Sequence, residues 1–498
     1  MLHTLLFLFF VLLVVFFIYD SIKPEYFPPG PRWLPLVGCL PRFWILRKKC
    51  GYIHEAIKEL SDIYGPVLGL KLGKQKLIVI SGHDLVKKVL LQEEFNGRPD
   101  GFFFRLRAFE KRRGVLFTDG PAWYEMRKFT MKHFRNFGLG QTTMINRVTV
   151  EAENLVKELQ KQCKNGPILM HRVFDVAIIN SLWIMFAGHG FEYGDKKMKD
   201  ILDTVHTAFR VMDTMGGLVS QMPFLRFLIP ELSGYNELVR IHEKFWAFID
   251  EEITNHDMKL DINLPQDLID TFLIEISRNK SADSIFNREN LLILCLDLFL
   301  AGSETTSNTL AWTFICLALY PEWITRLQKD LEKVVGRNRP PCMSDAPSLP
   351  RIEAFLAEVQ RSHILAPFGI PHRATKDVTL GGYKIPKDTL VLLSYYSVAM
   401  DKDHWENPKE FRPQRFLDSN GQFSQKSAAI PFGQGKRRCL GEILARSTLF
   451  LFFTYVIHYF DFEISPVHGT PDPNGYDGFS ISPKPYYLKL SLRSDLEN

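Results

Sequence analysis

The chain has 498 residues and a net charge of only +5, from 61 basic and 56 acidic side chains. So small an excess, without a basic run interleaved with aromatic residues, argues against a nucleic-acid-binding surface, and we expect no nucleic acid as a partner. The 7 cysteines are odd in number, scattered and without a CxxC pair, which argues against a disulfide framework and a zinc site. No segment beyond residue 45 has the composition of a linker, so the sequence predicts one large domain over residues 46–498.

The first residues, Met1 to Tyr19, are almost wholly apolar. As a helix they would extend roughly 28 Å, which is close to the thickness of the hydrocarbon core of a bilayer. A cleaved signal peptide is the alternative, but the run has no basic segment before it and no small-x-small cleavage site after it. We therefore predict an uncleaved transmembrane anchor over residues 1–20.

A proline-rich segment over residues 21–45 follows, with prolines at positions 28, 29, 31 and 35. Prolines fix φ and interrupt helices, so we predict a stiff, extended linker. Basic side chains follow the anchor closely, at Lys23, Arg32, Arg42, Arg47, Lys48 and Lys49. Positive residues beside a membrane helix stay on the cytoplasmic side, so we expect the main domain on the cytoplasmic face of the endoplasmic reticulum membrane.

Helical periodicity dominates the rest of the chain. It predicts helices over residues 151–163, 196–215, 235–256, 287–319, 323–335 and 443–459. Shorter β patterns at 67–72, 76–80, 378–385 and 390–394 predict small sheets. The segment 287–319 is apolar on most faces and should be a central buried helix. The predicted fold class is mainly α with small β-sheets (α+β).

A glycine-flanked cysteine, Cys439, lies just before the predicted helix 443–459. A thiol near a helix N-terminus is favoured as the thiolate, and Gly435 and Gly441 allow close approach of the backbone. An inert buried thiol is the alternative for any single cysteine.

The residues around Cys439 resemble the signature F-x-x-G-x-R-x-C-x-G of the haem-thiolate family, cytochrome P450. The match falls at Phe432, Gly435, Arg437, Cys439 and Gly441. The details are most similar to the animal microsomal clan, with an insect member as the narrower hypothesis. The resemblance implies the cytochrome P450 fold with its long central helix over haem b, Cys439 as axial ligand of the haem iron, and Arg437 as a propionate ligand.

The run Ala301-Gly302-Ser303-Glu304-Thr305-Thr306 lies in the predicted central helix. Leu298, Ala301, Gly302, Thr305 and Thr309 share one face of it. Burying an acid and a threonine in an apolar helix costs free energy unless these groups have a function. The alternative is that the Thr hydroxyl simply donates a hydrogen bond to a carbonyl of its own helix. The run resembles the oxygen-activating motif of the family, which implies that the catalytic residues Thr305 and Glu304 organise water and proton delivery to bound O2.

Three weaker patterns are similar to further family motifs. Glu358 and Arg361, at i and i+3, would form a buried structural network with Arg415 of the run Pro413-Gln414-Arg415-Phe416, in which Gln414 replaces the commoner glutamate. Taken alone, the first two are a common helix ion pair. Trp123 and Arg127, one turn apart, would bind a haem propionate, and so would Arg98 and His372. The alternatives are a surface cation–π pair and a packed histidine.

The family resemblance also implies pocket walls drawn from separated segments. The candidates are Phe102, Phe103, Phe104, Phe109, Val115, Phe117, Ala301, Glu304, Leu365, Ala366, Phe368, Ile370 and Phe479. All of them could instead belong to the core. Their apolar character favours a lipophilic, uncharged substrate: an isoprenoid, a sterol, a fatty acid or a xenobiotic. For an insect member, an isoprenoid hormone precursor is the most attractive of these.

The implied reaction inserts one oxygen atom of O2, by hydroxylation or epoxidation. The sequence has no dinucleotide fingerprint, so electrons from NADPH must arrive through a partner, NADPH–cytochrome P450 reductase, with cytochrome b5 as a second donor. Basic residues near the cysteine could form the docking face: Lys128, Lys132, Arg135, Lys436 and Arg438. A solvated charged surface is the alternative.

Three other functions compete with this reading. An oxygen-independent haem-thiolate isomerase or dehydratase would keep the cysteine but would not need Glu304 and Thr305. A non-catalytic haem-binding protein would bind haem without turnover. A cysteine-nucleophile hydrolase would need a histidine base near Cys439, and no local signature indicates one.

Overall fold

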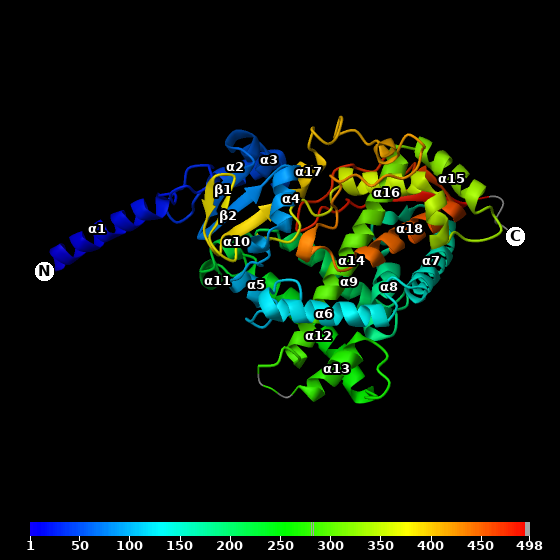
Figure 1. Ribbon diagram of the computed structural model, residues 1–498, viewed down its shortest axis with the longest axis horizontal. Coiled ribbons are helices and arrows are strands. Elements are labelled where there is room, and N and C mark those ends of the chain that lie inside the picture. The colour runs from blue at the N-terminus through cyan, green and yellow to red at the C-terminus, as the bar shows by residue number, and fades with distance from the viewer. Residues whose placement is uncertain (280, 282, 494–498) are drawn as a thin grey trace.

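Helices make up most of the protein, and a small sheet lies near the N-terminal end of the body (Figure 1). The computed structural model describes residues 1–279, 281 and 283–493. Its α-helices are α1 (Leu2–Ser21), α2 (Leu40–Cys50), α3 (Ile53–Tyr64), α4 (His83–Leu91), α5 (Phe102–Leu106), α6 (Gly120–Asn136), α7 (Thr142–Gln162), α8 (Asp175–Ala187), α9 (Lys196–Val211), α10 (Gly217–Gln221), α11 (Leu225–Leu228), α12 (Tyr235–Lys259), α13 (Leu268–Arg278), α14 (Arg288–Leu319), α15 (Glu322–Val334), α16 (Pro350–Ser362), α17 (Tyr395–Ala399) and α18 (Glu442–Tyr459). The 3-10 helices are η1 (Glu93–Phe95), η2 (Cys163–Asn165), η3 (Met170–Arg172), η4 (Met343–Ser348), η5 (Pro413–Phe416) and η6 (Gly435–Arg437).

Three small sheets accompany the helices, as the sequence predicts. The strands are β1 (Val67–Leu72), β2 (Gln75–Ile80), β3 (Ile168–Leu169), β4 (His372–Arg373), β5 (Val378–Leu380), β6 (Tyr383–Ile385), β7 (Leu390–Leu393), β8 (Phe460–Ile464) and β9 (Tyr487–Leu492). The largest sheet has the order β1-β2-β7-β4, with β1 antiparallel and β7 parallel to β2. It therefore brings residues 67–80 beside residues 372–393, which the sequence separates by about three hundred positions.

The long helix α14 crosses the centre of the molecule (Figure 1). It begins after Asn287, whose side chain accepts a hydrogen bond from the Asn290 N–H and so caps the first turn. Apolar side chains surround it, because α8, α12, α16 and α18 pack against it from different sides. The predicted central buried helix is confirmed, with its start one residue later than expected.

Helix α9 ends at Val211, four residues before the predicted end. The reason is Asp213, whose carboxylate accepts hydrogen bonds from the N–H groups of Met215 (2.8 Å) and Gly217 (2.9 Å). These bonds offer the backbone an alternative to the helix. Helix α7 instead begins nine residues before its predicted start. Met144 and Val148 extend its buried face toward the N-terminus, between polar residues that obscure the pattern in the sequence.

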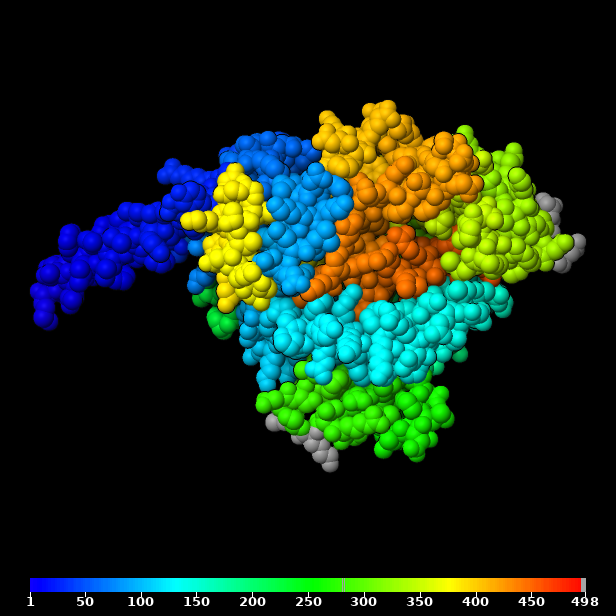
Figure 2. Space-filling view, in the orientation of Figure 1, coloured from blue at the N-terminus to red at the C-terminus, as the bar shows by residue number. Residues whose placement is uncertain are grey.

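The N-terminal helix α1 projects from the body, and none of its side chains is buried (Figures 1 and 2). Its length and apolar composition suffice to cross a membrane. A second apolar segment, Met170–Ala187, passes the same test but is mostly buried in the core. The predicted linker, residues 21–45, packs partly against the body: Trp33 is buried, and helix α2 begins at Leu40 within this range.

Candidate functional site

A largely apolar cavity of about 460 Å³ lies between α14 and the segment that carries Cys439. The five residues predicted to share one face of α14 all line it: Leu298, Ala301, Gly302, Thr305 and Thr309. Residues 428–433 and 437–441 form the opposite wall. Its size and lining are typical of a site for a small lipophilic molecule.

Cys439 is held in the cavity wall by a tight loop. Its N–H donates a hydrogen bond to the carbonyl of Phe432 (2.9 Å), which closes the loop between them. Within the loop, Gly435 has a φ of +70°, and a Cβ there would lie 2.2 Å from the carbonyl oxygen of Leu90. Only glycine fits this close approach, so the loop is pinned against the end of α4.

The electrostatic setting of the thiol differs from the simple expectation. Burial raises the pKa of Cys439 and Glu442 raises it further, whereas the N–H of Gly441 and the charges of Arg127 and Arg438 lower it. The start of α18 therefore favours the thiolate through the Gly441 N–H, but burial outweighs this effect. A bound metal cation deprotonates a coordinating thiol directly, so the site fits a metal-ligating cysteine better than a free nucleophile.

Among the arginines that line the same cavity, three lie near Cys439 and have been predicted to bind a cofactor: Arg98, Arg127 and Arg437. Arg437 donates to the carbonyls of Asn96 and Thr118, both at 2.8 Å, and lies 3.8 Å from the centroid of the Trp123 ring. Arg98 donates to the carbonyls of Ile370 (3.2 Å) and Pro371 (3.0 Å), and its Nε is buried without a hydrogen-bond partner. Arg127 donates to the carbonyl of Arg438 (2.8 Å).

None of these three arginines forms an ion pair with an Asp or Glu among the described residues. The nearest acid, Asp119, is already paired with Arg112 and Arg373. Burial and the neighbouring Arg98 together lower the pKa of Arg437 to about 8. Buried cations without counter-charges are costly, so the cavity is built for an anionic molecule such as one that carries carboxylates.

His372 lies beside these arginines and lines the cavity. Its Nδ1 donates to the carbonyl of Phe95 (2.7 Å), because a carbonyl can only accept. In the neutral ring the other nitrogen, Nε2, is then an acceptor. Burial lowers the pKa of His372 well below its usual value, so the imidazole is neutral. An anion bound beside it would raise this pKa and favour the protonated ring.

Thr305 and Glu304 lie on different sides of α14. Thr305 lines the cavity, and its hydroxyl donates to the carbonyl of Ala301 (2.6 Å), as in the alternative interpretation. Its oxygen lone pairs remain available as acceptors toward the cavity. Glu304 does not line the cavity: its carboxylate lies 2.5 Å from Nδ1 of His206 on α9 and accepts a hydrogen bond from Asn308 (2.8 Å).

The structure brings Glu358, Arg361 and Arg415 together. Arg361 makes two 2.7 Å hydrogen bonds to the Glu358 carboxylate, and Nε of Arg415 donates to it at 3.1 Å. The remaining donors of Arg361 bind the carbonyls of Ala399 and Pro408. All three side chains are buried, so the cluster joins α16 to η5 in the interior.

Most of the predicted pocket walls line the cavity: Phe103, Phe104, Val115, Phe117, Ala301, Leu365, Ala366, Ile370 and Phe479. Phe102, Phe109 and Phe368 do not. Phe102 stacks under Arg226 (3.8 Å) beside Tyr235, and Phe368 is buried in the core cluster next to the large sheet. Neighbouring residues on a helix or turn point in different directions, so one aromatic run cannot all face one cavity.

The sequence interpretation missed several polar residues of the cavity wall, among them Arg107, His242 and Asp297. Asp297 is an acid inside the apolar helix α14, which is the same signal that drew attention to Glu304. Arg107 and His242 come from an irregular segment and from α12, and no local pattern marks either.

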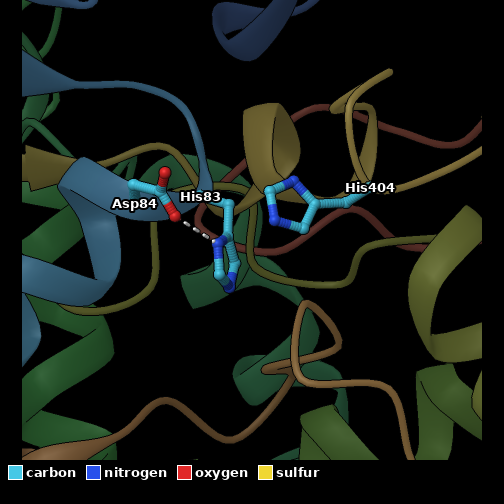
Figure 3. Close-up of side chains that lie close together, drawn as sticks. All are labelled: His83, Asp84 and His404. Atoms are coloured by element: carbon cyan, nitrogen blue, oxygen red, sulfur yellow. Dashed lines mark hydrogen bonds and ion pairs between the residues drawn. The ribbon is translucent and has the colours of Figure 1, made fainter.

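A cluster of side chains of the types that can ligate a metal, His83, Asp84 and His404, lies outside this cavity (Figure 3). His83 Nδ1 lies 2.9 Å from Asp84 Oδ1, and the rings of His83 and His404 are 4.1 Å apart. Asp84 is largely exposed. The contact packs α4 against the turn that follows α17.

The site combines a cysteine suited to metal ligation, a group of arginines without counter-charges and an apolar cavity. This combination is typical of a protein that binds an acidic metal cofactor beside a lipophilic substrate. Comparison with known proteins agrees. The family model "Cytochrome P450" matches residues 28–490. The chain is 37% identical to farnesoate epoxidase of Bombyx mori (95% of each chain), 36% identical to probable cytochrome P450 303a1 of Drosophila melanogaster (99% of this chain and 100% of the relative) and 36% identical to cytochrome P450 2J3 of Rattus norvegicus (89% and 86%).

The chain therefore belongs to the cytochrome P450 family. It is a haem-thiolate monooxygenase that works with a redox partner on lipophilic substrates. The predicted family and fold class are confirmed.

Proposed function

We propose that this protein is a membrane-anchored monooxygenase of the endoplasmic reticulum that epoxidises or hydroxylates an acyclic isoprenoid. Electrons come from NADPH through NADPH–cytochrome P450 reductase, with cytochrome b5 as a second donor. The observation that carries the proposal is the set of arginines without counter-charges around Cys439, one buried and two partly buried, in the wall of an apolar cavity. The isoprenoid class rests on the name of the Bombyx mori relative, a farnesoate epoxidase.

In this proposal Cys439 would ligate the iron of haem b. Arg98, Arg127 and Arg437 bind the two haem propionates, which supply the missing negative charges, while Trp123 packs against Arg437. His372 joins them as a charged donor once a propionate lies beside it. The bound haem supplies the activation of O2, for which thiolate ligation is suited.

Thr305 and Glu304 serve proton delivery. The Thr305 hydroxyl, fixed by its bond to Ala301, presents an acceptor that orders water in the cavity. Glu304 is part of a proton path on the far side of α14, where His206 and Arg210 keep its carboxylate ionised. The apolar walls exclude bulk water, which keeps protons from entering by other paths.

The remaining parts of the chain support this site. Glu358, Arg361 and Arg415 stabilise the fold near the cysteine loop. Residues 1–20 anchor the chain, residues 21–45 orient the catalytic domain of residues 46–498, and the basic residues after the anchor keep that domain on the cytoplasmic face.

The Cys439→Ser variant of the full-length chain tests the proposal. We expect it to lose the thiolate-type spectrum of the reduced carbon monoxide complex and the NADPH-dependent oxidation of an isoprenoid together. The control is Cys163→Ser, a partly exposed thiol outside the cavity, which should change neither. Retention of both properties by Cys439→Ser would falsify the assignment.

A further inference from the structure

The cluster of His83, Asp84 and His404 joins two segments that are distant in the sequence (Figure 3). His83 and Asp84 are the first two residues of α4, and His404 lies in the turn that follows α17. The proposed oxidation uses none of these side chains. Imidazole nitrogens and carboxylate oxygens both ligate Zn²⁺, so the residue types of the cluster suit a transition-metal ion.

The donor atoms of the cluster already lie near one another. One nitrogen of each histidine and one oxygen of Asp84 lie within 4.8 Å of each other, and the centroids of the two rings are 4.1 Å apart. Ligands around a tetrahedral Zn²⁺ are roughly 3.4 Å apart, because each bond measures about 2.0–2.1 Å. Since the side chains of Asp84 and His404 are exposed, small rotations bring all three ligands to this spacing.

The imidazole of His83 has an unused lone pair inside the cluster. Its side chain is only 6% exposed, and Nε2 has no hydrogen-bond partner in the described part of the chain. Its Nδ1 faces the carboxylate of Asp84 at 2.9 Å, and an ionised carboxylate can only accept. Neither nitrogen therefore accepts a hydrogen bond from a described residue, and the lone pair is free in either tautomer.

Asp401 holds the two histidines in position. Its Oδ2 accepts a hydrogen bond from the backbone N–H of His83 (3.1 Å), 318 positions earlier in the chain. The same oxygen lies 3.6 Å from Nδ1 of His404. A carboxylate beside one ring nitrogen is the usual arrangement that orients a metal-ligating histidine, and it leaves Nε2 of His404 for the ion.

A second cluster of similar composition, His256, Asp267 and Asp270, lacks such free donors. Asp267 accepts from the Asp270 N–H and pairs with His256, and Asp270 accepts from the Gln266 N–H. Although burial lowers the pKa of His256, its hydrogen bonds to Asp267 and Glu252 raise it to about 11. The charged ring has no lone pair, so this cluster is an ion pair that joins α12 to α13.

We propose that His83, Asp84 and His404 bind a divalent transition-metal ion such as Zn²⁺. Three protein ligands leave a fourth tetrahedral position, which water fills. Mg²⁺ and Ca²⁺ are bound through oxygen and suit the cluster poorly, because two of its three donors are nitrogens. None of the three residues lines the cavity, so the role of the ion is structural.

The ion would connect two segments that both contact the loop of Cys439. At the end of α4 the carbonyl of Leu90 meets Gly435, and Tyr395 of α17 lies beside Gly433. The unfolded chain does not hold the ligands together, so the ion binds the folded protein and stabilises it. We therefore expect zinc to raise the melting temperature.

Calorimetric titration of the full-length, haem-loaded protein in detergent with zinc chloride tests the site. We expect a single saturable site and a melting temperature that rises with the zinc concentration. Magnesium chloride at the same concentrations should produce neither effect. Absence of saturable zinc binding, or equal binding of magnesium, overturns the proposal.

Two variants remove exposed ligands and spare the buried His83. Asp84→Asn and His404→Ala should each weaken zinc binding about tenfold or more, and zinc should then raise the melting temperature less. His468→Ala, at an exposed histidine beside Ser465, is the control and should bind zinc like the wild type. Wild-type affinity in His404→Ala also overturns the site. Both measurements report binding without turnover, so their outcome is independent of the proposed oxidation.

Discussion

His206 on α9 and Glu304 on α14 form a buried ion pair, with Nδ1 of His206 2.5 Å from Oε2 of Glu304. The other ring nitrogen of His206 lies 2.8 Å from Asp175, and Arg210 lies 3.5 Å from Glu304. Burial alone would lower the pKa of His206, but its hydrogen bonds to Asp175 and Glu304 outweigh burial and raise it to about 10. The charged imidazole thus connects α9 with the helix that carries Thr305.

Loss of that imidazole should be strongly destabilising. In His206→Ala, Glu304 and Asp175 remain buried without their shared cation, and we expect a loss of roughly 3–5 kcal/mol in the free energy of unfolding. Urea denaturation followed by tryptophan fluorescence measures it. His189→Ala is the control, because His189 pairs with Glu252 at the surface and its loss should cost no more than about 1 kcal/mol. Equal losses in the two variants would contradict the buried pair.

The same pair predicts a pH dependence of stability. The raised pKa of His206 means that its contribution is complete below 6.5, its unfolded value, and is lost as the pH rises through about 10. The lowered pKa of Glu304 means that its contribution is present above 4.5 and is lost at more acidic pH. The stability of the wild type, relative to a variant with His206→Gln and Glu304→Gln, should therefore be greatest between pH 4.5 and 6.5. A difference that is constant from pH 4 to 10 would exclude this coupling.

Arg437 should be needed for haem retention more than for folding. Its partly buried guanidinium has no acidic partner among the described side chains, so Arg437→Gln removes an uncompensated charge together with a propionate ligand. We expect haem affinity to fall about tenfold or more, measured by haem transfer to an acceptor protein, with little loss of unfolding free energy. Arg326→Gln removes the cation–π contact of an exposed arginine with Trp323, outside the cavity, and should leave haem affinity unchanged. Equal haem affinity in both variants would count against the propionate assignment.

The structure changes which basic residues best fit a docking face. Lys436 and Arg438 are paired with Glu93 and Glu442, whereas Lys128 and Lys132, one turn apart on α6, are exposed and form no ion pair with a described residue. Reversal of both charges, Lys128→Glu with Lys132→Glu, should slow reduction by the reductase several-fold at low salt, and the defect should shrink as salt is added. Stopped-flow reduction measures the rate.

A matched pair on α9, Lys196→Glu with Lys199→Glu, is the control for that experiment. A defect of the same size in the control would show that net charge, not position, determines the rate. An unaffected rate in the Lys128 and Lys132 variant would exclude α6 from the docking face.

The sequence by itself determined those features that depend on local periodicity and short spacing. The apolar run of residues 2–21, the central helix 288–319 and the hairpin of residues 67–80 each carry their own pattern of side chains. The five small or polar residues on one face of α14 follow from helical geometry alone, and all five line the cavity. The spacing around Cys439 likewise indicated the family.

Only the tertiary structure decided how distant charges compensate one another. Nothing local shows that Glu304 turns away from Thr305 to meet His206, or that Arg107 neutralises Asp297 across 190 residues of chain. Such pairings arise where α9, α12 and α14 cross, and they depend on which groups burial deprives of water. Burial and charge compensation are properties of the packed molecule. A sequence pattern can therefore predict which residues form the site, but it cannot predict which of their charges pair or what their pKa values are.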